Sequence, residues 1–185
     1  MALTPAQMGD AIVRNLESKT GYPLEHWLDV LHEGDATDRK SAIAYLKSAG
    51  LGHFQAQKVF EASVGADPYA DPEALVEAQF PGASREAYAA FAKTCRALGE
   101  DVRAQPCRTY VPFYAARQFA MITAKPDGSL HVGLALPDDY THEAVESARG
   151  FGGSARINAR FALAPSGELT AGQREVLAQA YAYNR

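Results

Sequence analysis

The chain contains 185 residues, of which 47% are hydrophobic and 22% are charged, and its formal net charge is −4 at pH 7. This composition is ordinary for a globular protein and argues against a chain that is disordered throughout. The negative charge disfavours nucleic acid as the main partner, because neutralising phosphates requires a concentrated basic surface.

The sequence contains no segment typical of export or of membrane insertion. The N-terminal segment lacks a basic region followed by an apolar stretch, and no run approaches about 18 apolar residues. The cysteines, Cys95 and Cys107, fit neither a CxxC pair nor a zinc-binding spacing. We therefore expect a cytoplasmic protein without a membrane partner, in which Cys95 is a buried free thiol.

Four short helices are predicted before residue 65. Thr4 and Pro5 favour the start of the first, and Gly21 ends it. The second begins near Pro23, Thr37 caps the third, and the fourth runs from about residue 53 to residue 63. Residues 1–65 are therefore predicted to form a small helical bundle.

Three further helices are predicted beyond a linker at residues 65–72, where a glycine and two Asp-Pro steps disfavour helix. One begins after Asp71-Pro72, one after Ser84, and the last at Thr170. The middle helix carries the most regular apolar stripe of the chain, at Tyr88, Phe91, Cys95 and Leu98.

Period-two patterns predict four strands, at residues 108–114, 118–124, 130–136 and 157–163. The third of these strands alternates without a fault, with Leu130, Val132, Leu134 and Leu136 on one face. Asp127-Gly128 is a hairpin signal before it. Residues 66–185 are therefore predicted to form an α+β domain with a four-stranded, mainly antiparallel sheet packed against helices.

The sequence resembles two families that occur together. The motif KTGYPLEHW at residues 19–27, with residues 44–47 and 50–53, is similar to a small helical bacterial domain, domain-of-unknown-function family 4287. The motif RTYVPFY at residues 108–114, with residues 118–120 and 132–134, resembles its frequent companion, domain-of-unknown-function family 5655. The resemblance implies two domains and no assigned activity. Family 5655 often carries a His–Arg pair in its last strand, whereas here Ala159 precedes Arg160.

The Gly50-Leu51-Gly52 turn also resembles a helix–hairpin–helix, which holds a DNA phosphate on backbone N–H groups at the start of its second helix. The residues that would contact nucleic acid in that case are Gly50, Gly52, His53 and Lys58. The favoured alternative is structural, with Gly50 as a left-handed helix stop and Gly52 allowing close helix packing. Lys47 and Lys58 are the cations near the turn in sequence, and Glu61 offsets them.

No motif predicts catalysis, a metal or a cofactor. The histidines show no HxH or HExxH spacing, and the segment 150–154 lacks the lysine of a phosphate-binding loop and indicates a flexible connection. No serine or cysteine lies in a nucleophile elbow. An enzyme that used His131 or His53 as a base would have no other group at catalytic spacing. We therefore expect no catalytic residues, no metal and no cofactor.

The strongest candidate site is the sheet face opposite the leucines. With a suitable register it gathers Arg108, Tyr110, Tyr114, His131, Asn158 and Arg160. Aromatic and guanidinium groups on an uncovered sheet face suit an anionic or planar ligand. The alternative is that these are ordinary exposed strand residues, with the arginines paired to carboxylates. The sequence predicts a non-catalytic binding module for a small anionic or aromatic molecule or a peptide, with nucleic acid binding as the alternative.

Overall fold

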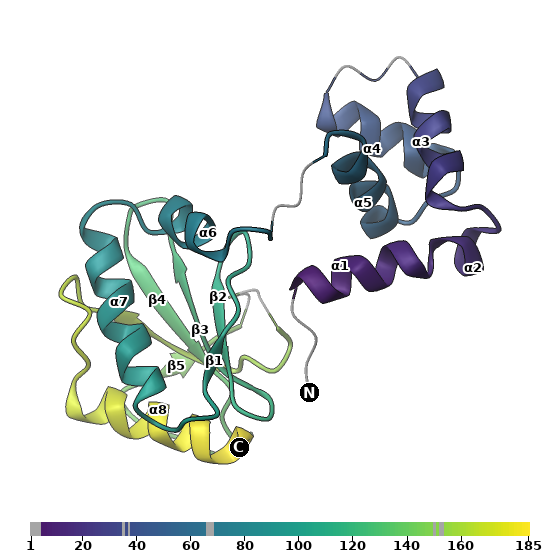
Figure 1. Cartoon of the computed structure of the whole chain (residues 1–185). Helices are drawn as coiled ribbons and strands as arrows, with labels where there is room; N and C mark the ends of the chain where they lie inside the picture. Colours follow the sequence, from purple (N-terminus) through teal and green to yellow (C-terminus); the bar gives the residue numbers. More distant parts are fainter. Residues whose placement is uncertain (1–4, 35, 37, 66–68, 150, 152–153) are drawn as a thin grey trace. The chain divides into compact units, whose positions relative to one another are not determined.

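The computed structural model describes residues 5–34, 36, 38–65, 69–149, 151 and 154–185 (Figure 1). The chain divides into two compact units, one within residues 3–70 and one spanning residues 71–185. The first is helical and the second combines helices with a sheet. This arrangement confirms the predicted α+β class, with helices first and an antiparallel sheet after them.

The N-terminal unit consists of helices packed around one apolar cluster. The helices are α1 (Pro5–Arg14), α2 (Leu16–Thr20), α3 (Leu24–Glu33), α4 (Arg39–Ser48) and α5 (His53–Ser63). The first predicted helix is interrupted at Asn15 and so forms both α1 and α2. The cluster at their centre contains Leu16, Trp27, Ile43, Leu46, Leu51, Ala56 and Val59.

Short-range hydrogen bonds explain where these helices begin and end. Asp38 caps α4, because its carboxylate accepts from the backbone N–H groups of Lys40 at 2.7 Å and Ser41 at 2.9 Å. Gly21, at φ 82°, ends α2 in the left-handed conformation that glycine adopts at little cost. The predicted caps Thr4 and Thr37 lie outside the described residues.

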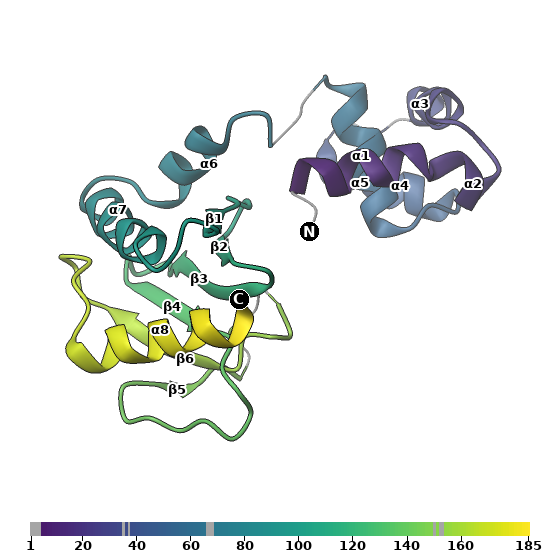
Figure 2. The same cartoon turned by 60° about the horizontal axis from the view of Figure 1, so that its bottom comes forward.

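The C-terminal unit is an antiparallel sheet with helices α6 (Pro72–Gln79), α7 (Ala83–Arg96) and α8 (Ala171–Asn184). Its strands are β1 (Arg103–Ala104), β2 (Val111–Tyr114), β3 (Gln118–Ala124), β4 (Leu130–Leu134), β5 (Glu146–Ser147) and β6 (Ala159–Leu163). They follow one another in the order β1-β2-β3-β4-β6-β5 (Figure 2). The prediction of four strands is wrong in number, since the sheet has six strands. The two-residue edge strands β1 and β5 are too short to give a period-two pattern.

The helices cover one face of the sheet and enclose the larger core. The strand residues in this core are Val111, Phe113, Ala120, Ile122, Leu130, Val132, Leu134, Ala159, Phe161 and Leu163. Phe91 and Cys95 from α7 and Leu177 from α8 pack against them. Cys95 is buried and free, as predicted, and burial raises the pKa of its thiol.

A β-bulge brings an additional aromatic side chain into this core. Phe113 pairs with Ala120 and Tyr114 pairs with Gln118, so Phe119 is an extra residue in β3. Its ring lies 6.5 Å from that of Phe113 and 5.6 Å from that of Tyr181 on α8. The bulge therefore allows Phe119 to share the helix-covered face with Phe113 and to join the sheet to α8.

The substitution Leu134→Ala should destabilise the C-terminal unit strongly, because the Leu134 side chain is 0% exposed at the centre of the helix-covered face. We expect a loss of about 2–5 kcal/mol in the free energy of unfolding, measured by denaturant titration, since the cavity fills only in part. Ala162→Ser, at an exposed position of β6, is the control and should cost less than about 0.5 kcal/mol. Equal effects of the two substitutions would contradict this assignment of the core.

Candidate functional site

The strand register determines which side chains share the face that the helices leave free. Thr123 lies opposite His131, and Gly133 lies between Met121 and Arg160 on the neighbouring strands. These residues alternate with the core residues, so they point to the other side of the sheet. We call this the outer face; it carries Tyr110, Pro112, Met121, Thr123, His131, Gly133 and Arg160.

The centre of the outer face is covered, in contrast to the uncovered face that the sequence predicted. Phe151 and Ile157 form a second apolar cluster with Met121 and Ala135. A Cβ atom on Gly133 would lie 2.6 Å from Cγ2 of Ile157 and 2.7 Å from Cε1 of Phe151. The covering side chains therefore rest directly on the backbone of β4. Phe151 comes from the segment 150–154 predicted as a flexible connection, of which residues 150, 152 and 153 lie outside the described residues. Ile157 was predicted to begin the last strand on the core face, whereas it precedes β6 and packs with Phe151 and Met121.

Beside this cover, two cations and a histidine surround the ring of Phe151. The Lys125 Nζ atom lies 4.9 Å from the ring centroid, and the Arg160 Cζ atom lies 5.9 Å from it. The His131 ring centroid is 6.4 Å away. We call these four residues, Lys125, His131, Phe151 and Arg160, the cation–aromatic cluster. They come from the β3–β4 turn, β4, the segment before β6, and β6.

The cluster carries more positive than negative charge. Arg160 Nε lies 3.0 Å from Glu146 Oε1 on β5, and the Glu146 side chain is 64% exposed, so solvent screens this pair. In the part of the chain that the structure describes, no carboxylate forms an ion pair with Lys125. The cluster therefore presents one cation with an exposed partner and one without an ion pair.

This environment favours the neutral form of His131. Burial lowers the pKa of His131, and the charges of Lys125 and Arg160 lower it further, against the opposite effects of Asp127 and Glu146. The Nδ1 atom of His131 is buried and has no hydrogen-bond partner among the described residues. The imidazole therefore lies beside two basic side chains that disfavour its protonation.

The structure brings together some of the predicted site residues and separates the others. His131 and Arg160 belong to the cation–aromatic cluster, and the half-buried Tyr110 packs against the cover of the outer face. Arg108 is exposed in the bend before β2. Tyr114 lies farther along β2, opposite Gln118, and burial raises the pKa of its hydroxyl.

The Asn158 side chain hydrogen-bonds the backbone of Leu136, and its role in binding stays a prediction. Its Nδ2 donates to the carbonyl of Leu136 at 2.8 Å, and its Oδ1 accepts from the N–H of Leu136 at 3.0 Å. These two hydrogen bonds join the segment after β4 to the residue before β6. The sequence did not single out Lys125 or Phe151, because neither lies in a predicted strand.

The Gly50-Leu51-Gly52 turn does join α4 to α5, with Gly50 at φ 113°. The Gly52 N–H donates to Gln55 Oε1 at 2.8 Å, and His53 is exposed. Lys58 is largely buried. Its Nζ lies 2.7 Å from Glu61 Oε2, and the two side chains are only 18% and 10% exposed. Lys58 therefore serves the packing of α5 and is poorly placed to contact a phosphate.

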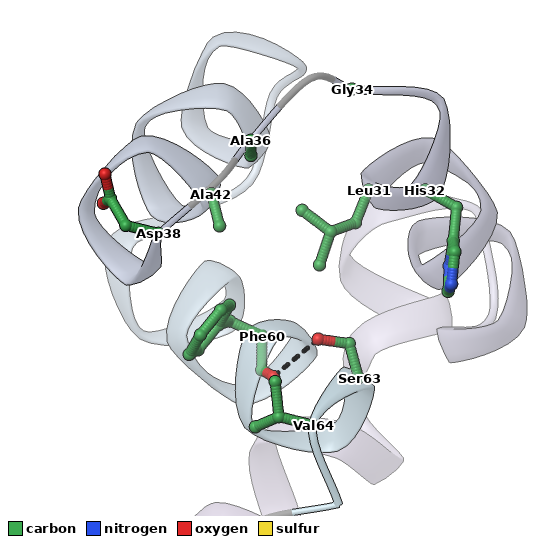
Figure 3. A pocket seen from close by; sticks show the side chains of 9 residues that line it. All are labelled: Leu31, His32, Gly34, Ala36, Asp38, Ala42, Phe60, Ser63 and Val64. Carbon is green, nitrogen blue, oxygen red and sulfur yellow. Dashed lines mark hydrogen bonds between the residues drawn. The ribbon is translucent and has the colours of Figure 1, made fainter.

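A pocket of about 410 Å³ lies in the N-terminal unit, between the end of α3, the start of α4 and the end of α5 (Figure 3). Leu31 and Ala42 are directed into it, and Phe60 lines it from below. Its polar groups already have partners, since Ser63 Oγ donates to the Phe60 carbonyl at 2.8 Å and Asp38 caps α4. The two capping N–H groups lower the pKa of Asp38. The lining therefore combines apolar side chains with the polar His32, Asp38 and Ser63, and the hydrogen bonds of Asp38 and Ser63 are made to their own helices.

The fold and the site together define an α+β domain with one helix-covered face and one face that carries cations around an aromatic ring. A model of the family described as "Domain of unknown function (DUF5655)" matches residues 76–184, and the chain belongs to this family. No curated protein and no solved structure matches the chain. The match begins within α6, so the resemblance of the N-terminal unit to family 4287 stays a prediction.

The described residues include neither a metal-binding cluster nor a membrane-spanning helix. Within these ranges, no group of three or more His, Cys, Asp or Glu residues is arranged to hold a metal ion. In the same part of the chain, none of the helices has both the length and the apolar character needed to span a membrane.

The environment of His131 predicts a specific pH dependence. The folded pKa lies below the ordinary value of about 6.5, so the unfolded chain binds more protons just below that pH. His131 should therefore reduce stability as pH falls from about 6.5 towards the folded pKa. A histidine-ring NMR titration should give a midpoint below about 6.5, raised in Lys125→Gln and Arg160→Gln. A midpoint above that value in the unaltered protein would contradict the assigned environment.

Proposed function

We propose that the C-terminal unit is a non-catalytic binding module that holds a small anionic or aromatic molecule at the cation–aromatic cluster. The observation that carries this proposal is the convergence of Lys125 and Arg160 within 6 Å of the Phe151 ring centroid. A peptide with an acidic or aromatic side chain would meet the same groups.

The chemistry of the cluster supports an anion. An arginine presents a planar fork of donors to a carboxylate or phosphate, and a lysine adds a compact point charge. Partial burial strengthens both contacts, because the effective dielectric is lower than in water. His131 adds a neutral polar group, so it can hydrogen-bond a ligand without a third positive charge.

The surroundings of His131 support binding in preference to catalysis. A histidine that acts as a base is normally oriented by a hydrogen bond on its second ring nitrogen. His131 Nδ1 has no such partner among the residues described. Cys95 is buried in the other face of the sheet, with a raised thiol pKa. The cluster itself contains no serine or cysteine and no carboxylate.

Phenyl phosphate, which combines an aromatic ring with an anion, is a suitable probe. It should raise the melting temperature of the protein, and Lys125→Ala and Arg160→Ala should each weaken its binding at least about tenfold, because a charge-assisted hydrogen bond contributes about 1.5–3 kcal/mol. Calorimetric titration measures this directly. Lys93→Ala, at an exposed position of α7, removes the same charge elsewhere and should bind as the unaltered protein does. Equal binding by all four proteins would refute the proposal.

A second candidate function is nucleic-acid contact through the Gly50-Leu51-Gly52 turn. The positive φ of Gly50 and the absence of a side-chain cap on α5 favour it, because backbone N–H groups at a helix start suit phosphate. Residues 1–70 nevertheless contain six basic and nine acidic side chains, which opposes it. We rank this candidate below binding at the cation–aromatic cluster.

A salt series of gel shifts tests this second candidate. Binding of duplex DNA should be detectable at about 50 mM salt and should fall steeply at higher salt, because phosphate contacts release counterions. Lys47→Ala, beside the turn, should weaken the shift, while Lys19→Ala on α2 should not. Absence of any shift at about 50 mM salt would eliminate the candidate.

We also propose that the N-terminal unit belongs to family 4287 and that the protein is bacterial and cytoplasmic. The resemblance of residues 19–27 and 50–53 to that family supports the family assignment and the bacterial origin. The two free cysteines, Cys95 and Cys107, support a reducing compartment.

A further inference from the structure

The ring of Phe151 lies in a slot whose floor is main chain. The Phe151 side chain is 7% exposed, and its Cε1 atom lies only 2.7 Å from where a Cβ on Gly133 would stand. Ile157 packs beside it on the same glycine. The slot is therefore flat, apolar at its base, and wide enough for one aromatic ring. Glycine at position 133 allows this approach, because a Cβ there would be too close to the ring and would displace it.

The charges around this slot do not match the side chain that fills it. Lys125 and Arg160 both lie within 6 Å of the Phe151 centroid, and His131 lies nearby. A phenyl ring attracts cations only weakly through its quadrupole, and phenylalanine is a poorer partner for them than tryptophan. It carries no anionic group to neutralise them. The same ring with a carboxylate or phosphate attached would satisfy both the slot and the cations.

We propose that Phe151 occupies an aromatic subsite and that the ring of an aryl anion takes its place there, with the anionic group held by Lys125 and Arg160. This inference rests on the proposed function and identifies the ligand class as an aromatic ring that bears a carboxylate or phosphate. The Phe151 side chain is then a competitor supplied by the chain itself. It lowers the affinity for every ligand that needs the slot.

Phe151→Ala and Phe151→Leu separate this role from simple packing. The alanine variant empties the slot, so it should bind phenyl phosphate about tenfold more tightly than the unaltered protein in calorimetric titration. Leucine still fills the slot, so the affinity of that variant for phenyl phosphate should rise little. Inorganic phosphate has no ring, so the substitution Phe151→Ala should increase its affinity much less than it increases that of phenyl phosphate. Equal gains for the two probes would overturn the inference, because they would indicate exposed charge alone.

An independent measurement uses the unaltered protein, so it does not depend on whether the alanine variant folds. Saturating phenyl phosphate should remove the NMR contacts between the Phe151 ring and the methyl groups of Ile157. The contacts between the rings of Phe113 and Phe119 should persist. Retention of the Phe151 contacts in the saturated complex would overturn the inference. If Arg160→Ala still weakens binding in that case, the proposed function stands without the aromatic subsite. If neither the unaltered protein nor any variant binds phenyl phosphate, the aromatic subsite and the proposed function are both refuted.

Discussion

The alternation of side chains along β4 is the constraint on which both faces of the C-terminal unit depend. Leu130, Val132 and Leu134 point into the helix-covered core, so His131 and Gly133 must point outwards. A slip of one residue would send the three apolar side chains to the outer face and remove the close approach of Phe151. The burial of the core therefore fixes the position of the candidate site, although the two share no side chain.

Gly133 determines how the outer face is used. A side chain at this position would hold Phe151 and Ile157 away from the sheet. Without one, they lie on the backbone and divide the outer face into a covered centre and a charged margin. Arg160, directly opposite Gly133 on β6, is thereby brought next to an aromatic ring and half-buried. The low pKa of His131 follows from the same arrangement, because burial and two nearby cations disfavour a third positive charge.

The strong periodic segments could be read from the sequence, and the short or irregular ones could not. The stripe of α7 and the alternation of β4 correctly indicated the helix-covered face. The bulge at Phe119 leaves no mark in a period-two pattern, because it reverses the parity that such a pattern assumes. His131 and Arg160 were found because they lie in regular strands. Lys125 and Phe151 were missed because they lie outside them, where only tertiary packing brings them to the outer face.

The balance of charge explains why a small anion suits this site better than a polymer. Glu146 partly neutralises Arg160, and His131 is neutral, so the uncompensated charge of the cluster is close to that of Lys125 alone. The chain as a whole is acidic, with a net charge of −4, and it repels a polyanion approaching along an extended surface. Such repulsion is small for a molecule that contacts only the cluster, because salt screens exposed charges beyond roughly 10 Å. The electrostatic field of the protein therefore favours a compact anion. The apolar slot beneath the cations favours an anion that carries an aromatic ring.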